Sequence, residues 1–329
     1  MNDIVKLALD IHNGSVAGNY SKTESDETLR MALIDANGGK SCIDPRAIRD
    51  GECTKLFQIM EEIITLTSEH GLQGDEFFMN CVEYRNKALG DSDRFYIPDD
   101  SLFVVSELAE GSQSVRRQKL EGGQDITVST RLHAIKAYEE MNRLLAGRVD
   151  INDFIDRVGR SFAQYDLNEI YSAWTGAMAA LKTPYSASGT FDEDKLLDII
   201  DHIEAETGET ATVYGTRRAL RKINTAILSD QSKDDMYAMG YFGKFNGTNL
   251  VRLKQRHKVN SSTFVLPDNE LYIMAGDQRF VKHVTEGDTF INQTQFTANV
   301  DLTQEYLMIQ RTGNAVVMAN KTAGIYKLS

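Results

Sequence analysis

Residues 149–181 read VDINDFIDRVGRSFAQYDLNEIYSAWTGAMAAL. Apolar side chains recur three or four residues apart along this stretch, which is typical of an amphipathic helix. Asp150 can cap the first turn, and Pro184 ends the pattern because the residue before a proline avoids the helical conformation. We therefore predict one helix over 150–181, about 45 Å long at roughly 1.5 Å per residue. Such a rod is far longer than the average helix and indicates an elongated domain built along it.

The composition is that of a globular protein with an acidic surface. The chain has 329 residues, of which 41% are hydrophobic and 26% charged, and its formal net charge is −12. This charge argues against nucleic-acid binding as the main task, because neutralising phosphates needs a basic face. No apolar run approaches the roughly 18 residues that span a bilayer. The acidic N-terminus lacks the apolar core of a signal peptide, so we expect neither a membrane segment nor a leader.

The cysteine pattern argues against a disulfide framework. Cys42, Cys53 and Cys81 are odd in number and not closely spaced. Together with His70 they could form a scattered zinc site, but their separations differ from those of the common structural zinc motifs. We predict buried free thiols in a reducing compartment and no metal site.

Residues 94–137 have Val-, Ile- and Thr-rich runs interrupted by glycines. The polar run 113–120, the turn Gly122-Gly123 and the alternating residues 126–134 predict the two strands and the turn of a long hairpin. Both faces of this hairpin are largely polar, and an isolated two-stranded hairpin is only marginally stable. We therefore expect it to project from its own domain and to lie on another molecule.

The N-terminal third predicts helices that follow a loosely organised arm. Residues 1–50 suggest an extended arm with one short helix over 28–36. Amphipathic patterns then predict helices over 52–70 and 75–89, and a further short helix is expected over 139–146.

Residues 184–275 predict a compact α/β unit, and the chain after it is rich in strands. The expected elements of the unit are helices over 191–207, 216–228 and 230–237 and strands over 210–214, 250–253, 264–266 and 271–275. Near the C-terminus, Thr312-Gly313-Asn314 is expected to form a turn between two strands that return to an earlier sheet.

Motifs of the common catalytic and nucleotide-binding classes are absent, including GxGxxG, the P-loop, HExxH and GxSxG. The acidic run Asp192-Glu193-Asp194 fits the first turn of a helix, where the helix dipole favours carboxylates. The six histidines include no pair spaced four residues apart on one helix. We therefore predict no catalytic residue, no cofactor and no metal. An oligomeric enzyme with its site in residues 184–276 remains an alternative without a supporting motif.

Two groups of cationic side chains stand out in a chain whose net charge is negative. One group lies on the predicted hairpin, and the other forms one face of the helix predicted from residue 216. Either could meet phosphate, but in so acidic a chain we favour pairing with carboxylates of a neighbouring chain. The predicted inter-subunit contacts are Arg116, Arg117, Lys119, Arg217, Arg218 and Arg221.

The order of these elements resembles the major capsid protein of tailed bacteriophages along nearly the whole chain. SLFVVSELAEGSQSVRRQKLEGG, residues 101–123, is similar to the family's extended loop, and YEEMNRLLAGRVDINDFIDRVGRSF, residues 138–162, to its entry into the spine helix. ATVYGTRRALRKI and GYFGKFNG resemble segments of its axial domain, and LPDNELYIMAGD resembles the strand that leads back. Each motif is weak alone, so the resemblance depends on their order and spacing.

The resemblance implies an α+β fold of the tailed-phage major capsid type. Its implied parts are an N-terminal arm with helices over 1–93, an extended loop hairpin over 94–137, a peripheral domain over 138–183 and 277–329 that contains a spine helix over 150–181, and an inserted axial α/β domain over 184–276. In this family the axial domain points to the centre of each pentamer or hexamer, and the extended loop lies across the adjacent subunit. In some members a long N-terminal scaffolding segment is cut off. We expect this arm to be ordered and to be kept, because its helices run into the hairpin without a polar linker.

The resemblance also implies a structural role. Copies of the chain would form the pentamers and hexamers of an icosahedral bacteriophage head, enclose double-stranded DNA without reading its sequence, and assemble in the host cytoplasm into the virion. Scaffolding, portal and decoration proteins are the further partners that it implies, and no membrane is involved. Some members cross-link a loop lysine, and Lys119 lies in the matching loop, but no motif identifies the rest of that chemistry. An encapsulin-type nanocompartment shell shares the fold and remains the alternative.

Overall fold

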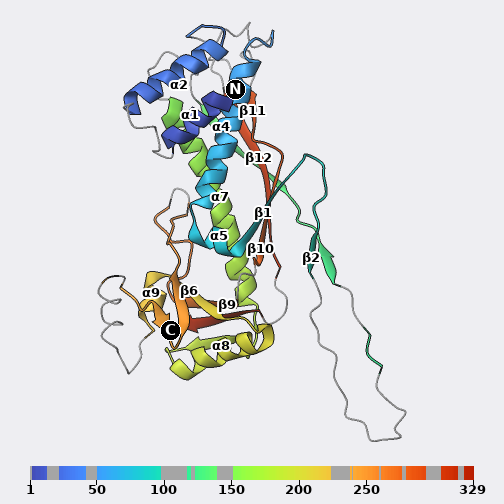
Figure 1. The fold of residues 1–329 in the computed structure, drawn as a ribbon, viewed down its shortest axis with the longest axis vertical. Coiled ribbons are helices and arrows are strands. Elements are labelled where there is room, and N and C mark those ends of the chain that lie inside the picture. The colour runs from blue at the N-terminus through green and yellow to red at the C-terminus, as the bar shows by residue number, and fades with distance from the viewer. Residues whose placement is uncertain are drawn as a thin grey trace, which may run out of the picture.

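An elongated body is built around the helix α7, Ile151–Ala179, which runs from a group of N-terminal helices to a sheet at the opposite end (Figure 1). The computed structural model describes residues 2–12, 22–41, 50–97, 117–119, 123–138, 151–223, 238, 240–258, 261–275, 279–293, 305–317 and 322–329. The helix predicted over 150–181 is therefore confirmed to within two residues at each end. Its Leu167, Ile170 and Trp174 are completely buried, so the predicted apolar stripe forms the centre of the core.

A five-stranded sheet lies along α7. Its strands are β1 Val82–Lys87, β4 Arg131–Tyr138, β10 Val281–Glu286, β11 Phe290–Gln293 and β12 Glu305–Val316. The central strand β12 pairs with β4 along one edge and with β10 and β11 along the other, always antiparallel. β1 adds to β10 in parallel. The C-terminal residues thus return to pair with earlier parts of the chain, as predicted.

A six-stranded sheet lies at the other end of α7, with strand order β5-β13-β9-β6-β8-β7. The strands are β5 Ser186–Gly189, β6 Ala211–Gly215, β7 Lys244–Phe245, β8 Thr248–Arg252, β9 Glu270–Ala275 and β13 Ala323–Leu328. The last strand of the chain, β13, lies between β5 and β9. Of the strand predicted over 264–266, only an isolated bridge between His257 and Phe264 is present.

Two helices bury their apolar faces against this second sheet in one core cluster. α8, Glu193–Thr207, begins at Asp192, whose carboxylate accepts the N–H of Asp194 at 3.2 Å. Glu193 and Asp194 lie in the first turn, as predicted for the acidic run, whereas Asp192 precedes the helix and caps it. α9, Arg217–Arg221, is capped by Thr216. The rest of the helix predicted over 216–228 lies mostly outside the described residues, as does the whole of the helices predicted over 230–237 and 139–146.

The N-terminal region is more ordered than the sequence predicted. α1, Asn2–His12, and α2, Lys22–Ala36, occupy much of the stretch that was expected to be an extended arm. Val5 of α1 and Leu29 of α2 are buried in one cluster with Leu56 of α4, Thr54–Gln73. The helix predicted over 28–36 is confirmed as the C-terminal part of α2, whereas the extended conformation expected for residues 2–12 and 22–27 was wrong. These helices pack on α4, and local patterns do not reveal such packing.

The prediction of one helix over 75–89 was wrong for its second half, which is not helical. α5, Glu76–Cys81, is followed directly by the strand β1. Val82 and Tyr84 of β1 alternate with the charged Glu83 and Arg85, and the partner strand β10 begins at Val281, about two hundred positions along the chain. Local propensity cannot reveal so distant a partner, and pairing with it overrides the helical pattern.

The turn predicted at Thr312-Gly313-Asn314 was also wrong, because β12 runs through these residues without a break. Gly313 is paired with Val284, and a Cβ atom on it would lie 2.4 Å from the carbonyl oxygen of Ser129. The glycine therefore allows a close approach of two backbones and does not form a bend.

The predicted hairpin is present with different strands. Residues 124–126 form β3, which pairs antiparallel with β2, Phe95–Ile97, and not with residues 113–120. The strand predicted over 126–134 is interrupted between β3 and β4. Of the run 113–120, only 117–119 are described, and these have no regular secondary structure.

The contact between α4 and α7 is unusually close at two glycines. A Cβ on Gly71 of α4 would lie 2.9 Å from Cβ of Ala163, and a Cβ on Gly159 of α7 would lie 2.7 Å from Cγ2 of Thr67. Gly71 was predicted to end its helix, but α4 continues to Gln73. Both glycines therefore serve to bring the two helices together, because nothing larger fits between them.

Buried polar contacts fix the other neighbours of α7. Asp75 caps α5, accepts the hydroxyl of Tyr171 at 3.1 Å and forms an ion pair with Arg256 at 2.8 Å. This group joins α5, α7 and the segment that follows β8. Further along α7, Asp166 accepts the hydroxyl of Thr312 in β12 at 2.9 Å, and burial raises the pKa of its carboxyl to about 7.

Across the described ranges, no helix combines the length and the apolar character needed to cross a membrane.

A substitution at Gly159 tests the close contact between α4 and α7. Gly159→Ala should lower the free energy of unfolding by about 1–3 kcal/mol, because the added methyl group overpacks the contact with Thr67. The matched control is Gly176→Ala on the same helix, where the added Cβ has no neighbour within 4 Å and the residue is exposed. This control should stabilise the protein by up to about 1 kcal/mol through helix propensity alone. Urea denaturation measures both, and equal stabilisation by the two variants would contradict the close packing.

Candidate assembly surfaces

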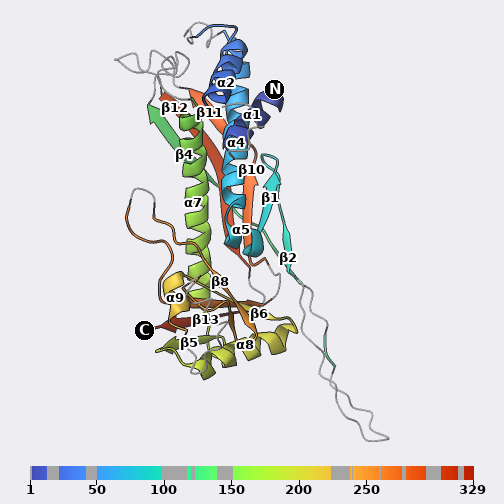
Figure 2. The same cartoon turned by 60° about the vertical axis from the view of Figure 1, so that its left-hand side comes forward.

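The two-stranded ribbon β2–β3 lies beside the first sheet (Figures 1 and 2). Its register pairs Phe95 with Ile126 and Ile97 with Gln124. The two aromatic residues of β2 face opposite ways, since Phe95 is buried and Tyr96 is 65% exposed. The N–H of Gly123 donates to the Tyr96 hydroxyl oxygen at 3.3 Å. The ribbon is thus fixed to the body on one face and leaves the aromatic side chain of Tyr96 exposed on the other.

Phe95 anchors the ribbon to the first sheet. It packs with Val128 and Val284 in a small cluster of its own. The Arg85 guanidinium lies 4.2 Å from the centroid of its ring, and the Lys282 ammonium 5.5 Å from it. Because a cation over an aromatic face is attracted by the ring electrons, both contacts hold the ring against β1 and β10.

Charged side chains next to this ring form a connected network. Arg85 pairs with Glu83 at 2.7 Å and with Asp93 at 2.9 Å, and Lys282 also pairs with Glu83. Asp93 lies just before β2, so the network joins the entrance of the ribbon to strands β1 and β10. A network of this kind restricts the ribbon more than an isolated surface pair would.

Glu286, at the end of β10, joins four segments at the other side of the ribbon base. Its carboxylate accepts the Thr130 hydroxyl and the N–H of Gly90 at 2.9 Å, and it pairs with Lys87 at 3.6 Å and Arg311 at 3.3 Å. The hydrogen bond from Thr130 is the main reason why the pKa of this carboxyl is lowered to about 2, and the Gly90 hydrogen bond and the two cations also contribute. The carboxylate is therefore ionised over the whole physiological range and fixes the chain between β3 and β4.

The predicted contact residues fall into two separate places. Arg116 lies outside the described residues, whereas Arg117 and Lys119 are exposed in the segment between β2 and β3. The remaining three lie together on α9: Arg217, Arg218 and Arg221, all exposed. Arg218 is paired within the chain, to Asp268 at 3.0 Å.

The sequence did not reveal the residues that anchor the ribbon. Phe95 and Glu286 appear in it as an ordinary aromatic and an ordinary acid, because the contacts of Glu286 reach across as many as 199 residues (286 − 87). The run FYI in residues 95–97 offered one local signal, since two aromatic residues beside an isoleucine favour a strand.

No group of three or more His, Cys, Asp or Glu side chains in the described ranges is arranged to hold a metal ion. Cys53 and Cys81 are buried free thiols, and burial raises the pKa of Cys81 to about 12. Cys42, the third member of the scattered set considered for zinc, lies outside the described residues.

Comparison with known proteins gives one family match. The model of the family described as "SPbeta prophage-derived putative capsid protein YonB" matches residues 19–327. A comparison of the sequence with curated proteins finds no match.

Several solved structures resemble the chain at low sequence identity. The mature capsid of bacteriophage PhiM1 is 14% identical with a TM-score of 0.47, and the match covers 77% of this chain and 87% of that one. The capsid of an empty GTA particle is 13% identical with a TM-score of 0.47, covering 78% and 90%. The SrpI encapsulin from Synechococcus elongatus PCC 7942 is 9% identical with a TM-score of 0.45, covering 76% and 86%. With TM-scores below 0.5, these likenesses assign no residue a role.

Removing the charge of Glu286 tests the ribbon anchor. Glu286→Gln should lower the free energy of unfolding at pH 7 by about 1.5–3 kcal/mol, the usual contribution of hydrogen bonds to a charged group. Because the folded-state pKa is depressed, this contribution is present above the ordinary carboxyl pKa of 4.5 and is lost as the pH falls towards about 2. Urea denaturation at pH 7 and pH 3 should therefore give a smaller difference between variant and wild type at pH 3.

Asp125→Asn provides the control for this experiment, because it removes an exposed carboxylate from the same ribbon. We expect it to change stability by less than about 0.5 kcal/mol at both pH values. A Glu286→Gln variant that matches the wild type at pH 7 would show that the four-segment contact does not stabilise the fold.

Proposed function

Because the chain belongs to the family of the SPbeta prophage-derived capsid protein YonB, and is therefore a structural component of a virion and not an enzyme, we propose that copies of it assemble into the icosahedral shell of a bacteriophage head. The family match over residues 19–327 carries this proposal, since it includes nearly the whole chain. In the proposed shell the chain forms pentamers and hexamers that enclose double-stranded DNA. A net charge of −12 keeps the wall from adsorbing that DNA while it is packaged.

The proposal assigns a role to each part of the chain. We assign α7 as the spine of a peripheral domain over 138–183 and 277–329, and the second-sheet unit over 184–276 as an axial domain near the capsomer centre. The strand β13 joins the two, because it follows the first sheet in sequence and pairs with β5 and β9. Residues 1–93 are assigned as an ordered arm, which agrees with the packing of α1 and α2 on α4.

The segment over 94–137 is proposed as a clamp between subunits. Its base is fixed by the buried Phe95 and by the contacts of Glu286, so its position relative to the first sheet is set within one copy. Beyond the base, the exposed Tyr96 and the cations Arg117 and Lys119 provide an aromatic contact and charges for the acidic surface of the next copy. Arg116 is assigned to the same contact.

The remaining partners follow from a role in a head. Assembly in the host cytoplasm, a scaffolding protein, a portal and decoration proteins belong to the proposal as the components with which such a shell is built and filled. The encapsulin alternative differs in its contents, because an encapsulin holds protein cargo. Electron microscopy of particles purified after expression tests the shell itself, and nuclease-protected DNA or a co-purified protein inside it separates the two functions.

Deleting residues 112–123 tests the clamp. The subunit should stay folded, because the anchors Phe95, Val128 and Glu286 lie outside the deletion. It should lose stable shells, because the buried area and charge pairs between copies are removed. Negative-stain microscopy and sedimentation measure assembly, and circular dichroism measures folding.

A Gly/Ser segment of equal length in place of 112–123 serves as the comparison. It keeps the connection between β2 and β3 and removes the side chains, so it should assemble as poorly as the deletion. Normal particles of wild-type stability from either variant would reject the clamp.

A further inference from the structure

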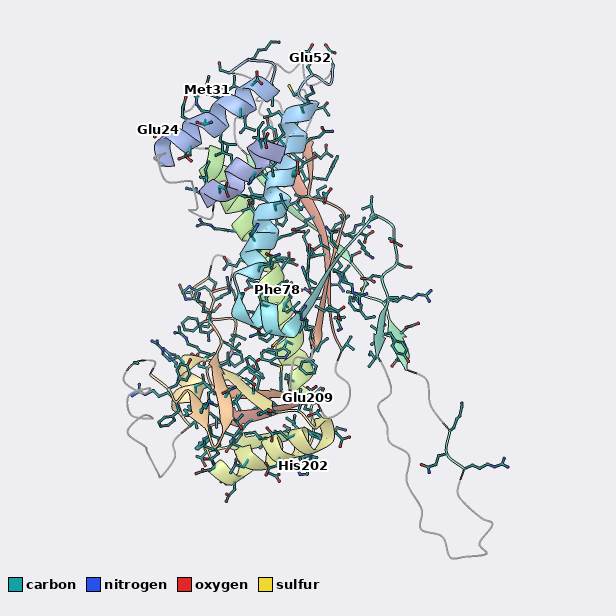
Figure 3. The ribbon with its side chains drawn as sticks, viewed as in Figure 1. Glu24, Met31, Glu52, Phe78, His202 and Glu209 are labelled. Carbon is teal, nitrogen blue, oxygen red and sulfur yellow. The ribbon has the colours of Figure 1, made fainter. Side chains whose placement is uncertain are left out.

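Charges of opposite sign gather at two ends of the second-sheet unit. α9 and the residues that end and follow β8 carry cations, whereas the second half of α8 and the turn after it carry carboxylates. Figure 1 places α9 at one end of this unit, and Figure 3 places Glu209 at the other. The cations of α9 and the carboxylate of Glu209 therefore lie at different ends of this unit within one molecule.

Four exposed cations on two adjacent segments, which we call the basic face, are Arg217, Arg221, Arg252 and Lys254. Internal contacts hold its two segments together. The N–H of Leu253 donates to the carbonyl oxygen of Gly215, just before α9, at 2.8 Å.

Asp268 bridges the same two segments, because it pairs with Arg218 at 3.0 Å and accepts the Gln255 amide at 2.9 Å. The position of the basic face is thus fixed by the fold. Within the described part of the chain, none of its four cations forms an ion pair.

The carboxylates, which we call the acidic end, are Asp201 and Glu209, both exposed. The last turn of α8 contains no basic residue, and the helix closes at Gly208 in the left-handed conformation. The C-terminal end of a helix carries a partial negative charge, so the carboxylate of Glu209, next to the capping Gly208, is favoured there only with a cation nearby. A cation of a second copy would therefore stabilise this end.

We propose that the basic face of one copy binds the acidic end of α8 on a second copy, and that this head-to-tail contact, repeated around an axis, closes the ring of a capsomer. A contact between two different faces of the same chain generates a closed ring when the rotation between copies allows it. The inference rests on the proposed function and deepens it, since it names both sides of the contact near the ring centre. It also names the acidic end of a second copy as the binding partner of Arg217 and Arg221.

A second copy fits the basic face better than DNA does. The same unit supplies a matching acidic surface, already at the end that a head-to-tail neighbour presents. The chain as a whole repels DNA through its net charge of −12. DNA binding by the basic face is therefore the competing outcome of the test.

Charge reversal on each side, followed by their combination, tests the pairing. Arg217→Glu with Arg221→Glu reverses the basic face, and Asp201→Lys with Glu209→Lys reverses the acidic end. Each pair alone should reduce the yield of particles at least about tenfold, because like charges then meet across the contact. All four changes together should restore particles, which also shows that the altered chains still fold.

Arg217→Lys with Arg221→Lys is the matched control, since it keeps the charge and should assemble like the wild type. Particle yield is measured by sedimentation and negative-stain microscopy, and retained DNA by nuclease protection. Wild-type yield from either reversed pair, or no recovery in the combined variant, overturns the pairing and leaves the shell function intact. Reversal of the basic face that lowers retained DNA without changing assembly assigns this face to DNA and also overturns it. A wild-type chain that forms no shell overturns the proposed function and this inference together.

Discussion

The close contact between α4 and α7 is the constraint on which the rest of the structure depends. At Gly71 and Gly159 the two helices approach so closely that a single methyl group would not fit. This contact fixes α7 along its N-terminal half, while its C-terminal half is buried by both sheets through Trp174 and its neighbours. Because α7 contributes to two core clusters, one with the N-terminal helices and the first sheet and one with strands of both sheets, its displacement would disturb all of these elements at once.

Buried polar contacts fix the relative positions of the segments that pack around α7. Asp75 ties α5 and α7 to the segment after β8, and Glu286 ties the ribbon base to β1, β10 and β12. In each case a largely buried carboxylate has several donors, which favours one arrangement because moving any segment leaves a charge without partners. The ribbon therefore has a fixed base, and Tyr96 on its other face is exposed, which agrees with the contact between subunits that we propose.

The candidate contact residues were predicted in part from the sequence. Cations in an acidic chain stand out by contrast, so Arg217 and Arg221 could be identified from charge alone, and the structure places both on one exposed face. The acidic end at Glu209 and the anchor at Glu286 could not be identified in the same way. Carboxylates are common in this chain, and what distinguishes these two is the end of a helix in one case and four distant partners in the other.

The sequence by itself determined the long helix α7, the helix α4 and the helix α8, because each depends on apolar spacings of three or four residues. Only the tertiary structure decided that residues 82–87 form a strand and that Gly313 lies within one. A glycine that forms a turn and a glycine that admits a second backbone look identical in sequence. The difference lies in what approaches it, and at Gly313 that is Ser129, 184 positions earlier in the chain (313 − 129).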